Sequence, residues 1–147
     1  MINIDSVIQA ISIKINTFRV KLTTKIYMEM VEQGFKEPCF FIKELRSNQS
    51  KEISNRYKRV HLYDIHYFPS PNSRTKNQDM REKAELLYEN MEYITVGSKP
   101  LMGLEMNHQI QDGVLHFFIR YPIHLFKEVE AIPKMGTLDY GGGLKSE

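Results

Sequence analysis

Four isoleucines share a helical spacing near the N-terminus. They are Ile4, Ile8, Ile11 and Ile15. This spacing is typical of one face of a helix, and Asp5 or Ser6 can cap its start. The isoleucine content leaves a strand as an alternative, but the cap and the length favour a helix over residues 4–18.

Three apolar runs then predict strands. TKIYMEM (24–30) is a short strand, CFFIKEL (39–45) is a β-rich strand, and RYKRVHLYDIHYF (56–68) is a long one. Gly34 and Pro38 punctuate the loop after the first run. The polar stretch NQSKEISN (48–55) is either a turn or the tip of a long hairpin.

A loop and a second helix follow. PSPNSRTKNQ (69–78) has two prolines and no apolar residue, which predicts a loop. The next segment, DMREKAELLYENME (79–92), predicts a helix with one apolar stripe. The stripe consists of Met80, Ala84, Leu87, Tyr88 and Met91. Arg81 and Glu85 lie at i,i+4 on the other side.

The segment 101–126 predicts a hairpin, because Asp112-Gly113 separates two alternating runs. A two-residue turn pairs Gln111 with Val114 and continues outward to Leu104 opposite Tyr121. In that register Glu105 faces Arg120 as an ion pair. His108 falls on the apolar face, where a hydrogen-bonded histidine is favoured over a metal ligand.

The order of elements is helix, three strands, helix, and at least two strands. It predicts an α+β fold, with a mostly antiparallel sheet of about five strands packed with two helices. We expect a single domain over residues 1–132. Residues 133–147 hold three consecutive glycines and little to bury, which predicts an extended tail.

Composition narrows the class of protein. The chain has 147 residues, a net charge of +2 and a single cysteine, Cys39. One cysteine excludes an intrachain disulfide and a cysteine-based zinc site, and its β-rich surroundings favour a buried, inert thiol. There is no apolar run long enough for a membrane span and no basic-then-apolar leader, so we expect a protein made and kept in the cytosol.

Candidate chemistry concentrates in residues 56–68. On a strand, alternate side chains point to opposite faces, so Asp64 and His66 share one face while His61 lies on the other. A metal site from these three residues is therefore disfavoured. Asp64 and His66 could form an acid–base pair, but a hydrogen-bonding pair near an interface is the simpler hypothesis. His116 and His124 lie about 27 Å apart along a strand and cannot share a metal.

The same run raises the possibility of nucleic-acid binding. Arg56, Lys58 and Arg59 flank Tyr57, as in a small basic patch. Alternation divides these residues between two faces, and Asp64 dilutes their charge. We therefore expect no specific nucleic-acid binding, and we keep a small nucleic-acid-binding protein as an alternative. We also expect no cofactor and no enzymatic activity.

Four blocks in order resemble a known family. GFKEPCFFIKEL, NRYKRVHLYDIHYFPSPNS, DGVLHFFIRY and PKMGTLDYGGGLK are similar to small prophage proteins of Gram-positive bacteria described as tail terminators. The resemblance runs from about Tyr27 to the C-terminus, and the N-terminal helix matches only in type.

The resemblance implies a structural role. Such terminators are α+β proteins that form hexameric rings on the last layer of a tail tube or sheath, stop its polymerisation, and present a surface to a neck or collar protein. A headless contractile bacteriocin particle is equally possible, and a neck or head–tail connector is the alternative. The chain would reside in the host bacterial cytoplasm during assembly and then at the tail apex.

Subunit and partner contacts are expected from the basic strand, the 69–78 loop and the segment after Ile132. Because a ring needs two complementary surfaces on each subunit, strand edges and an extended tail suit it. The expected contact residues are Arg56, Lys58, Arg59, Asp64, His66, Pro69, Pro71, Arg74, Lys134, Met135 and Tyr140.

Overall fold

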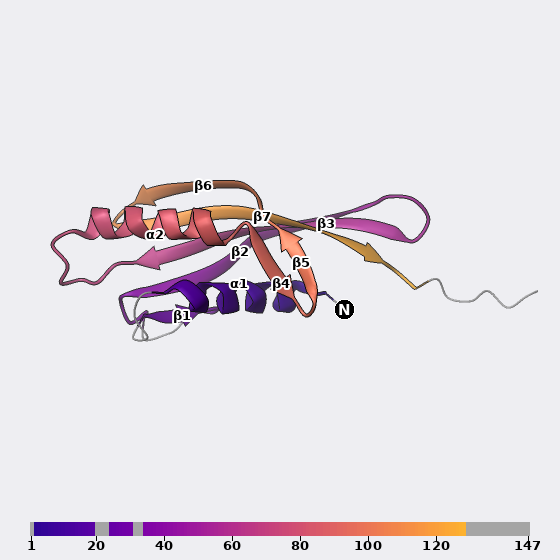
Figure 1. Ribbon diagram of the computed structural model, residues 1–147. Coiled ribbons are helices and arrows are strands. Elements are labelled where there is room, and N and C mark those ends of the chain that lie inside the picture. The colour runs from indigo at the N-terminus through magenta and orange to yellow at the C-terminus, as the bar shows by residue number, and fades with distance from the viewer. Residues whose placement is uncertain (1, 20–23, 31–33, 129–147) are drawn as a thin grey trace, which may run out of the picture.

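The computed structural model describes residues 2–19, 24–30 and 34–128 (Figure 1). The helices are α1 (Ile4–Phe18) and α2 (Lys76–Asn90). The strands are β1 (Lys25–Tyr27), β2 (Cys39–Lys51), β3 (Arg56–Phe68), β4 (Tyr93–Val96), β5 (Lys99–Met102), β6 (Leu104–Gln111) and β7 (Val114–Phe126). The Lys134, Met135 and Tyr140 contacts and the tail boundary at residue 132 lie outside the described residues, so they stay predictions.

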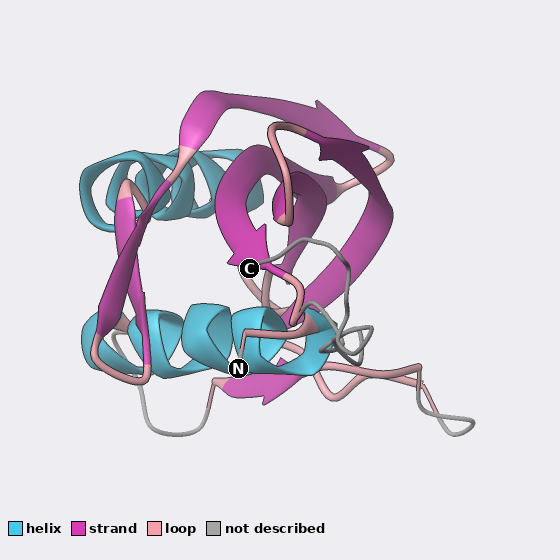
Figure 2. Cartoon of the chain, turned by 90° about the vertical axis from the view of Figure 1, so that its right-hand side faces the viewer, coloured by secondary structure: helices cyan, strands magenta, loops and turns pink. Residues whose placement is uncertain are grey.

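The α+β fold is confirmed. Five strands form one sheet in the order β1-β2-β3-β7-β6, and every pairing in it is antiparallel except that of β1 with β2. Figure 2 shows both helices on the same side of this curved sheet. The β4–β5 hairpin, a separate two-stranded sheet, was not predicted.

Helix α1 has the predicted bounds but a different cap. Asn3 is the N-cap: its side chain accepts from the Ser6 backbone N–H at 2.8 Å, while Ser6 Oγ accepts from the Asn3 N–H at 2.8 Å. This capping box satisfies two N–H groups that the helix itself cannot. The buried stripe is Val7, Ala10, Ile11 and Ile15. The buried face is therefore rotated about the helix axis from the predicted one, and Ile4 is exposed.

Helix α2 begins at Lys76, so residues 76–78 belong to the helix and not to the predicted loop. Its first turn is polar and gave no apolar signal. Four of the five predicted stripe residues, Met80, Ala84, Leu87 and Met91, are buried, and the fifth, Tyr88, is half-buried. Lys83 is buried as well, which the stripe did not predict.

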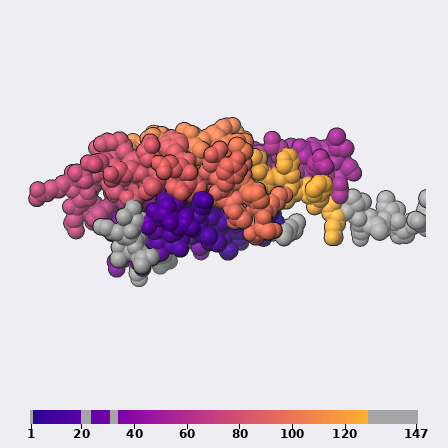
Figure 3. Space-filling model, viewed as in Figure 1, coloured from indigo at the N-terminus to yellow at the C-terminus, as the bar shows by residue number. Residues whose placement is uncertain are grey.

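Strand β2 continues to Lys51, six residues beyond its predicted end, so NQSKEISN is the tip of a long hairpin. We call residues 47–60 of this hairpin the arm. Figure 1 and Figure 3 show the arm projecting beyond the helices, beside the end of β7.

The C-terminal hairpin follows the predicted register from Gln111–Val114 to Asn107–Phe118. Between Leu104 and Asn107 the register shifts, and Glu105 adopts a φ of 55°. Leu104 consequently pairs with Arg120 and not with Tyr121. The predicted Glu105–Arg120 ion pair still forms, at 2.9 Å.

The core lies between the sheet and the helices. Odd-numbered residues of the two central strands supply most of the sheet side: Tyr63, Ile65, Tyr67, Leu115, Phe117, Ile119, Tyr121 and Ile123. The buried Tyr121 hydroxyl donates to the Met91 carbonyl at 2.6 Å, which ties β7 to the end of α2. The even-numbered residues of these strands point to the opposite face.

Candidate functional site

The face of the sheet opposite the helices, which we call the open face, carries a cluster of ionisable side chains. Its centre is formed by Asp64 and His66 on β3 and by His116 and Phe118 on β7. His66 pairs directly with His116 across the two strands, and Asp64 pairs with Phe118. Neither helix packs on this face in the part of the chain that the structure describes.

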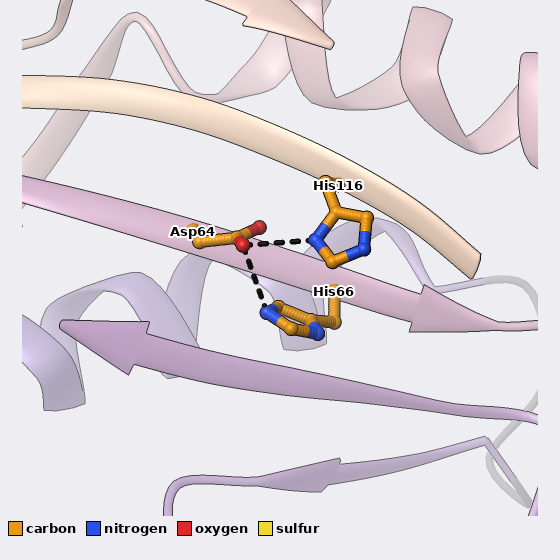
Figure 4. Close-up of side chains that lie close together, drawn as sticks. All are labelled: Asp64, His66 and His116. Carbon is orange, nitrogen blue, oxygen red and sulfur yellow. Dashed lines mark hydrogen bonds and ion pairs between the residues drawn. The ribbon is translucent and has the colours of Figure 1, made fainter. Parts of the chain in front are cut away.

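Asp64, His66 and His116 form a compact cluster (Figure 4). Asp64 Oδ2 lies 2.9 Å from His66 Nε2 and 2.9 Å from His116 Nδ1. The His116 contact is a hydrogen bond. The His66 contact lacks hydrogen-bond alignment, since His66 Nε2 has no partner of that kind among the described residues.

Aromatic rings surround the cluster. The Phe41 ring lies edge-on to His66 at 5.4 Å between centroids, and Phe68 lies 6.0 Å away. Phe118 stacks on His116 at 6.3 Å. Phe35 covers Phe41 and Phe68 at 4.8 and 5.2 Å. The cluster therefore lies in an apolar frame that weakens screening by water.

His61 lies apart from this cluster, as alternation predicted. It faces the helix side of the sheet, is completely buried, and has Nδ1 2.9 Å from Ser47 Oγ and 3.5 Å from Glu44 Oε2. Burial lowers the pKa of His61, and the neighbouring Glu44 carboxylate opposes this effect. The H-x-x-D-x-H segment therefore does not form one site.

The other predicted positions are dispersed. His108 lies on the helix side but is exposed, and its Nδ1 is 2.8 Å from the Tyr88 hydroxyl. His124 is exposed near Glu52, at 3.3 Å. Cys39 is buried as predicted, and burial raises its pKa to about 12.

The basic residues of β3 all lie on the arm. Arg56 and Lys58 point to one face and Arg59 to the other, as alternation predicted. Arg59 Nε donates to Gln49 Oε1 at 3.0 Å, and the Arg56 guanidinium lies 5.3 Å from the centre of the Phe126 ring. Each contact holds two neighbouring strands together.

The 69–75 loop is exposed only in part. Pro71 and Arg74 are exposed, but Pro69 is buried, so it is not available as the surface contact we predicted from the loop. Pro69 directly follows β3, where the chain still packs against the domain.

A polar network beside this loop was not predicted from the sequence. Asp79 accepts hydrogen bonds from the Tyr67 hydroxyl at 2.6 Å and from Lys83 Nζ at 2.8 Å, and Lys83 lies 5.1 Å from the Tyr67 ring centre. Burial and the Asp79 hydrogen bond raise the pKa of Tyr67. The i,i+4 spacing of Asp79 and Lys83 was the available signal. The network joins α2 to β3.

Comparison with known proteins gives one informative match. A family model described as "Phage tail terminator protein" matches residues 6–133. Comparison with curated proteins finds no match. One solved structure covers 89% of this chain and 100% of its own, at 11% identity and a TM-score of 0.34, which is too low to carry an argument.

Proposed function

Because this chain belongs to the phage tail terminator family, we propose that it forms a hexameric ring on the last layer of a phage or phage-like tail and ends polymerisation there. The match over residues 6–133 carries the proposal. In this role the chain is a structural protein of the tail. Its partners are further copies of itself, the tube or sheath protein below, and a neck or collar protein above.

The free strand edges support ring formation. β1 pairs with only three residues of β2, so residues 42–51 of β2 have β3 as their sole partner in the described chain. β6 likewise pairs only with β7 there. Unpaired backbone N–H and C=O groups at such edges can accept a strand from a neighbour. Each subunit therefore offers two edges through which copies can join.

The arm supplies a further contact surface. Its β2 half is exposed throughout, and Ile53 at the tip has 83% of its surface exposed. Arg56 is held over Phe126, and Lys127 lies 4.5 Å from the centre of the Tyr57 ring, so basic groups and aromatic rings are ordered together beside its tip. One exposed isoleucine on an otherwise polar, projecting hairpin tip suits insertion between neighbouring subunits.

The test compares two exposed isoleucines. In Ile53→Asp the tip becomes charged, while in Ile13→Asp an isoleucine on α1, 67% exposed, is changed in the same way. We expect both variants to unfold at the wild-type temperature, because neither side chain is in the core. We expect Ile53→Asp alone to shift the chain from ring to single subunit, measured by light scattering after gel filtration and by negative-stain imaging.

The biological readout is tail length. Particles assembled with Ile53→Asp should carry tails of irregular or excessive length, while Ile13→Asp particles should be normal. A wild-type chain that remains a single subunit, both alone and with purified tails, would disprove the ring. Normal rings and tails with Ile53→Asp would remove the arm from the interface and leave the ring to the strand edges.

A further inference from the structure

We propose that Asp64, His66 and His116 bind one divalent transition-metal cation of the Zn²⁺ type on the open face of the sheet. The proposal rests on the geometry of the cluster and is independent of ring formation. The three ligand atoms are Asp64 Oδ2, His66 Nε2 and His116 Nδ1, which lie within 4.8 Å of one another.

The ligands come from two strands that are hydrogen-bonded on both sides. β3 and β7 are the two central strands of their part of the sheet, each flanked by another strand at this point. His66 and His116 are a direct cross-strand pair, and Asp64 precedes His66 by two residues on the same face. Sites built on paired strands keep their ligands in place better than sites on loops.

The distances suit a small ion. Zn²⁺ binds nitrogen and oxygen at about 2.0–2.2 Å, so two ligands of one ion lie at most about 4.4 Å apart. The two contacts with Asp64 Oδ2 measure 2.9 Å. A tetrahedral ion holds its ligand atoms roughly 3.3–3.6 Å apart. The three ligand atoms lie within 4.8 Å of one another, so rotation of the imidazole rings and the carboxylate must bring them to that spacing.

Two buried atoms of the cluster lack hydrogen-bond partners in the described chain. They are Asp64 Oδ1 and His66 Nε2. A buried polar atom without a partner costs about 1–3 kcal/mol, more when it is charged. A cation between the carboxylate and the imidazoles satisfies His66 Nε2 directly and attracts both carboxylate oxygens.

Ligand chemistry selects the cation. Two imidazoles and one carboxylate are typical ligands of Zn²⁺ and related transition metals, whereas Mg²⁺ and Ca²⁺ prefer six or more oxygen ligands. Phe41, Phe68 and Phe118 form the outer shell, and an apolar shell strengthens the attraction between the ion and its carboxylate.

Three protein ligands leave one position of a tetrahedron free. The side chains of Asp64, His66 and His116 are 7, 15 and 23% exposed, so an ion enters from the open face and keeps one side towards it. Water fills that position in a single subunit.

The alternative is that Asp64 simply links β3 to β7 through its hydrogen bond with His116 and its close contact with His66. In that case the cluster has no particular affinity for a metal. The two readings differ in what Zn²⁺ does to the imidazole nitrogens, so the experiment measures those nitrogens directly.

The full-length chain is stripped with a chelator and titrated with Zn²⁺ by calorimetry, with Mg²⁺ as the hard-cation control. We expect one Zn²⁺ per chain and a rise in unfolding temperature with Zn²⁺ alone, because a ligand that binds only the folded state stabilises it. In ¹⁵N spectra of the histidine rings, saturation should shift His66 Nε2 and His116 Nδ1.

Isosteric variants identify the ligands. Asp64→Asn, His66→Gln and His116→Gln should each weaken Zn²⁺ binding by more than about tenfold, the loss that even outer-shell changes cause. His124→Gln is the matched control, because His124 also faces a carboxylate, Glu52, at 3.3 Å, but these two residues belong to no group of three ligands in the described chain. It should bind Zn²⁺ as the wild type does.

Two results would overturn the proposal. One is unchanged His66 Nε2 and His116 Nδ1 resonances at saturating Zn²⁺, a measurement that needs no variant to fold. The other is Zn²⁺ binding that survives all three ligand variants or is lost in His124→Gln.

Discussion

His61 shows how the fold controls a single ionisable group. It is fully buried on the helix side of β3, and its Nε2 has no hydrogen-bond partner in the described chain. Protonation would place a charge in an apolar layer beside Tyr63, and only Glu44 would compensate for it. The pKa of His61 is therefore lowered, with burial as the main cause.

This lowered pKa predicts an acid-sensitive contribution to stability. Below the ordinary histidine pKa of about 6.5 the unfolded chain takes up a proton that the folded chain resists, so the free energy of unfolding falls as the pH drops. The contribution is fully present above that value. His61→Gln removes the titrating group, so the stability of wild type relative to variant should decrease between pH 7.5 and 5.

Urea denaturation at several pH values measures the difference. His124→Gln serves as the control, since its side chain is exposed beside Glu52. A wild-type advantage that stays constant, or grows, towards acid pH would contradict the assignment.

At this scale, strand alternation correctly predicted which face each residue of β3 lies on, but it could not predict contacts between strands. Alternation alone separated His61 from Asp64 and His66. It could not supply His116, because that contact depends on the pairing of β3 with β7, which is set by the packing of the whole sheet. The cluster of Asp64, His66 and His116 was missed for this reason, because His116 lies 52 positions after Asp64 along the chain.

At the scale of elements, the capping box of α1 offers a direct test. Asn3→Ala removes the acceptor for the Ser6 N–H and should lower the free energy of unfolding by about 0.5–2 kcal/mol. Asn3→Asp keeps an acceptor and should retain most of the stability. Asp5→Ala, a first-turn acid outside the box, should cost less, about 0.3–1 kcal/mol.

Chemical denaturation monitored by circular dichroism gives these values. If Asn3→Ala proves no worse than Asp5→Ala, the box does not stabilise the helix in solution.

Elements with an apolar face could be predicted, and those without one could not. The stripes of α1 and α2 and the alternation of β3 located these elements. The outer half of β2, from Arg46 to Lys51, has no apolar residue on either face, so only its pairing with β3 makes it a strand. The register shift at Glu105 could not be predicted from the sequence. The backbone bends locally there, but the ion pair with Arg120 that the regular register predicts still forms.

For the whole molecule, the described core and the proposed contact residues Lys134, Met135 and Tyr140 lie in different parts of the chain. Among the residues that the structure describes, every member of the buried core cluster lies between Val7 and Ile123. A chain that ends at residue 133 should therefore unfold at the wild-type temperature. We propose that it nevertheless fails to form rings, because it lacks Lys134, Met135 and Tyr140.

The matched control ends at Tyr140 and keeps these three residues. Light scattering and tail-length measurements on both truncations decide the question. Wild-type rings and normal tails from the shorter chain would show that residues 134–147 take no part in assembly.

The arrangement of the sheet lay beyond the sequence. β7 crosses back to lie between β3 and β6, although α2 and the β4–β5 hairpin separate it from β3 in the chain. β1 joins in parallel, against the antiparallel trend. The order of strands in the sheet depends on long-range packing of apolar faces, which local sequence patterns do not specify. The spacing of apolar and polar residues alone also could not identify the phage tail terminator family.

The two free edges of the sheet, along residues 42–51 of β2 and along β6, are unlike in length and sequence. If copies join by laying one of these strands against the other, every junction points the same way around the circle. The assembled circle then has an upper and a lower rim made of different residues, and no rotation can exchange them. Such a ring could bind the growing tube through one rim only, so it would bind in a single orientation. The opposite rim would then not bind the next layer of tube protein.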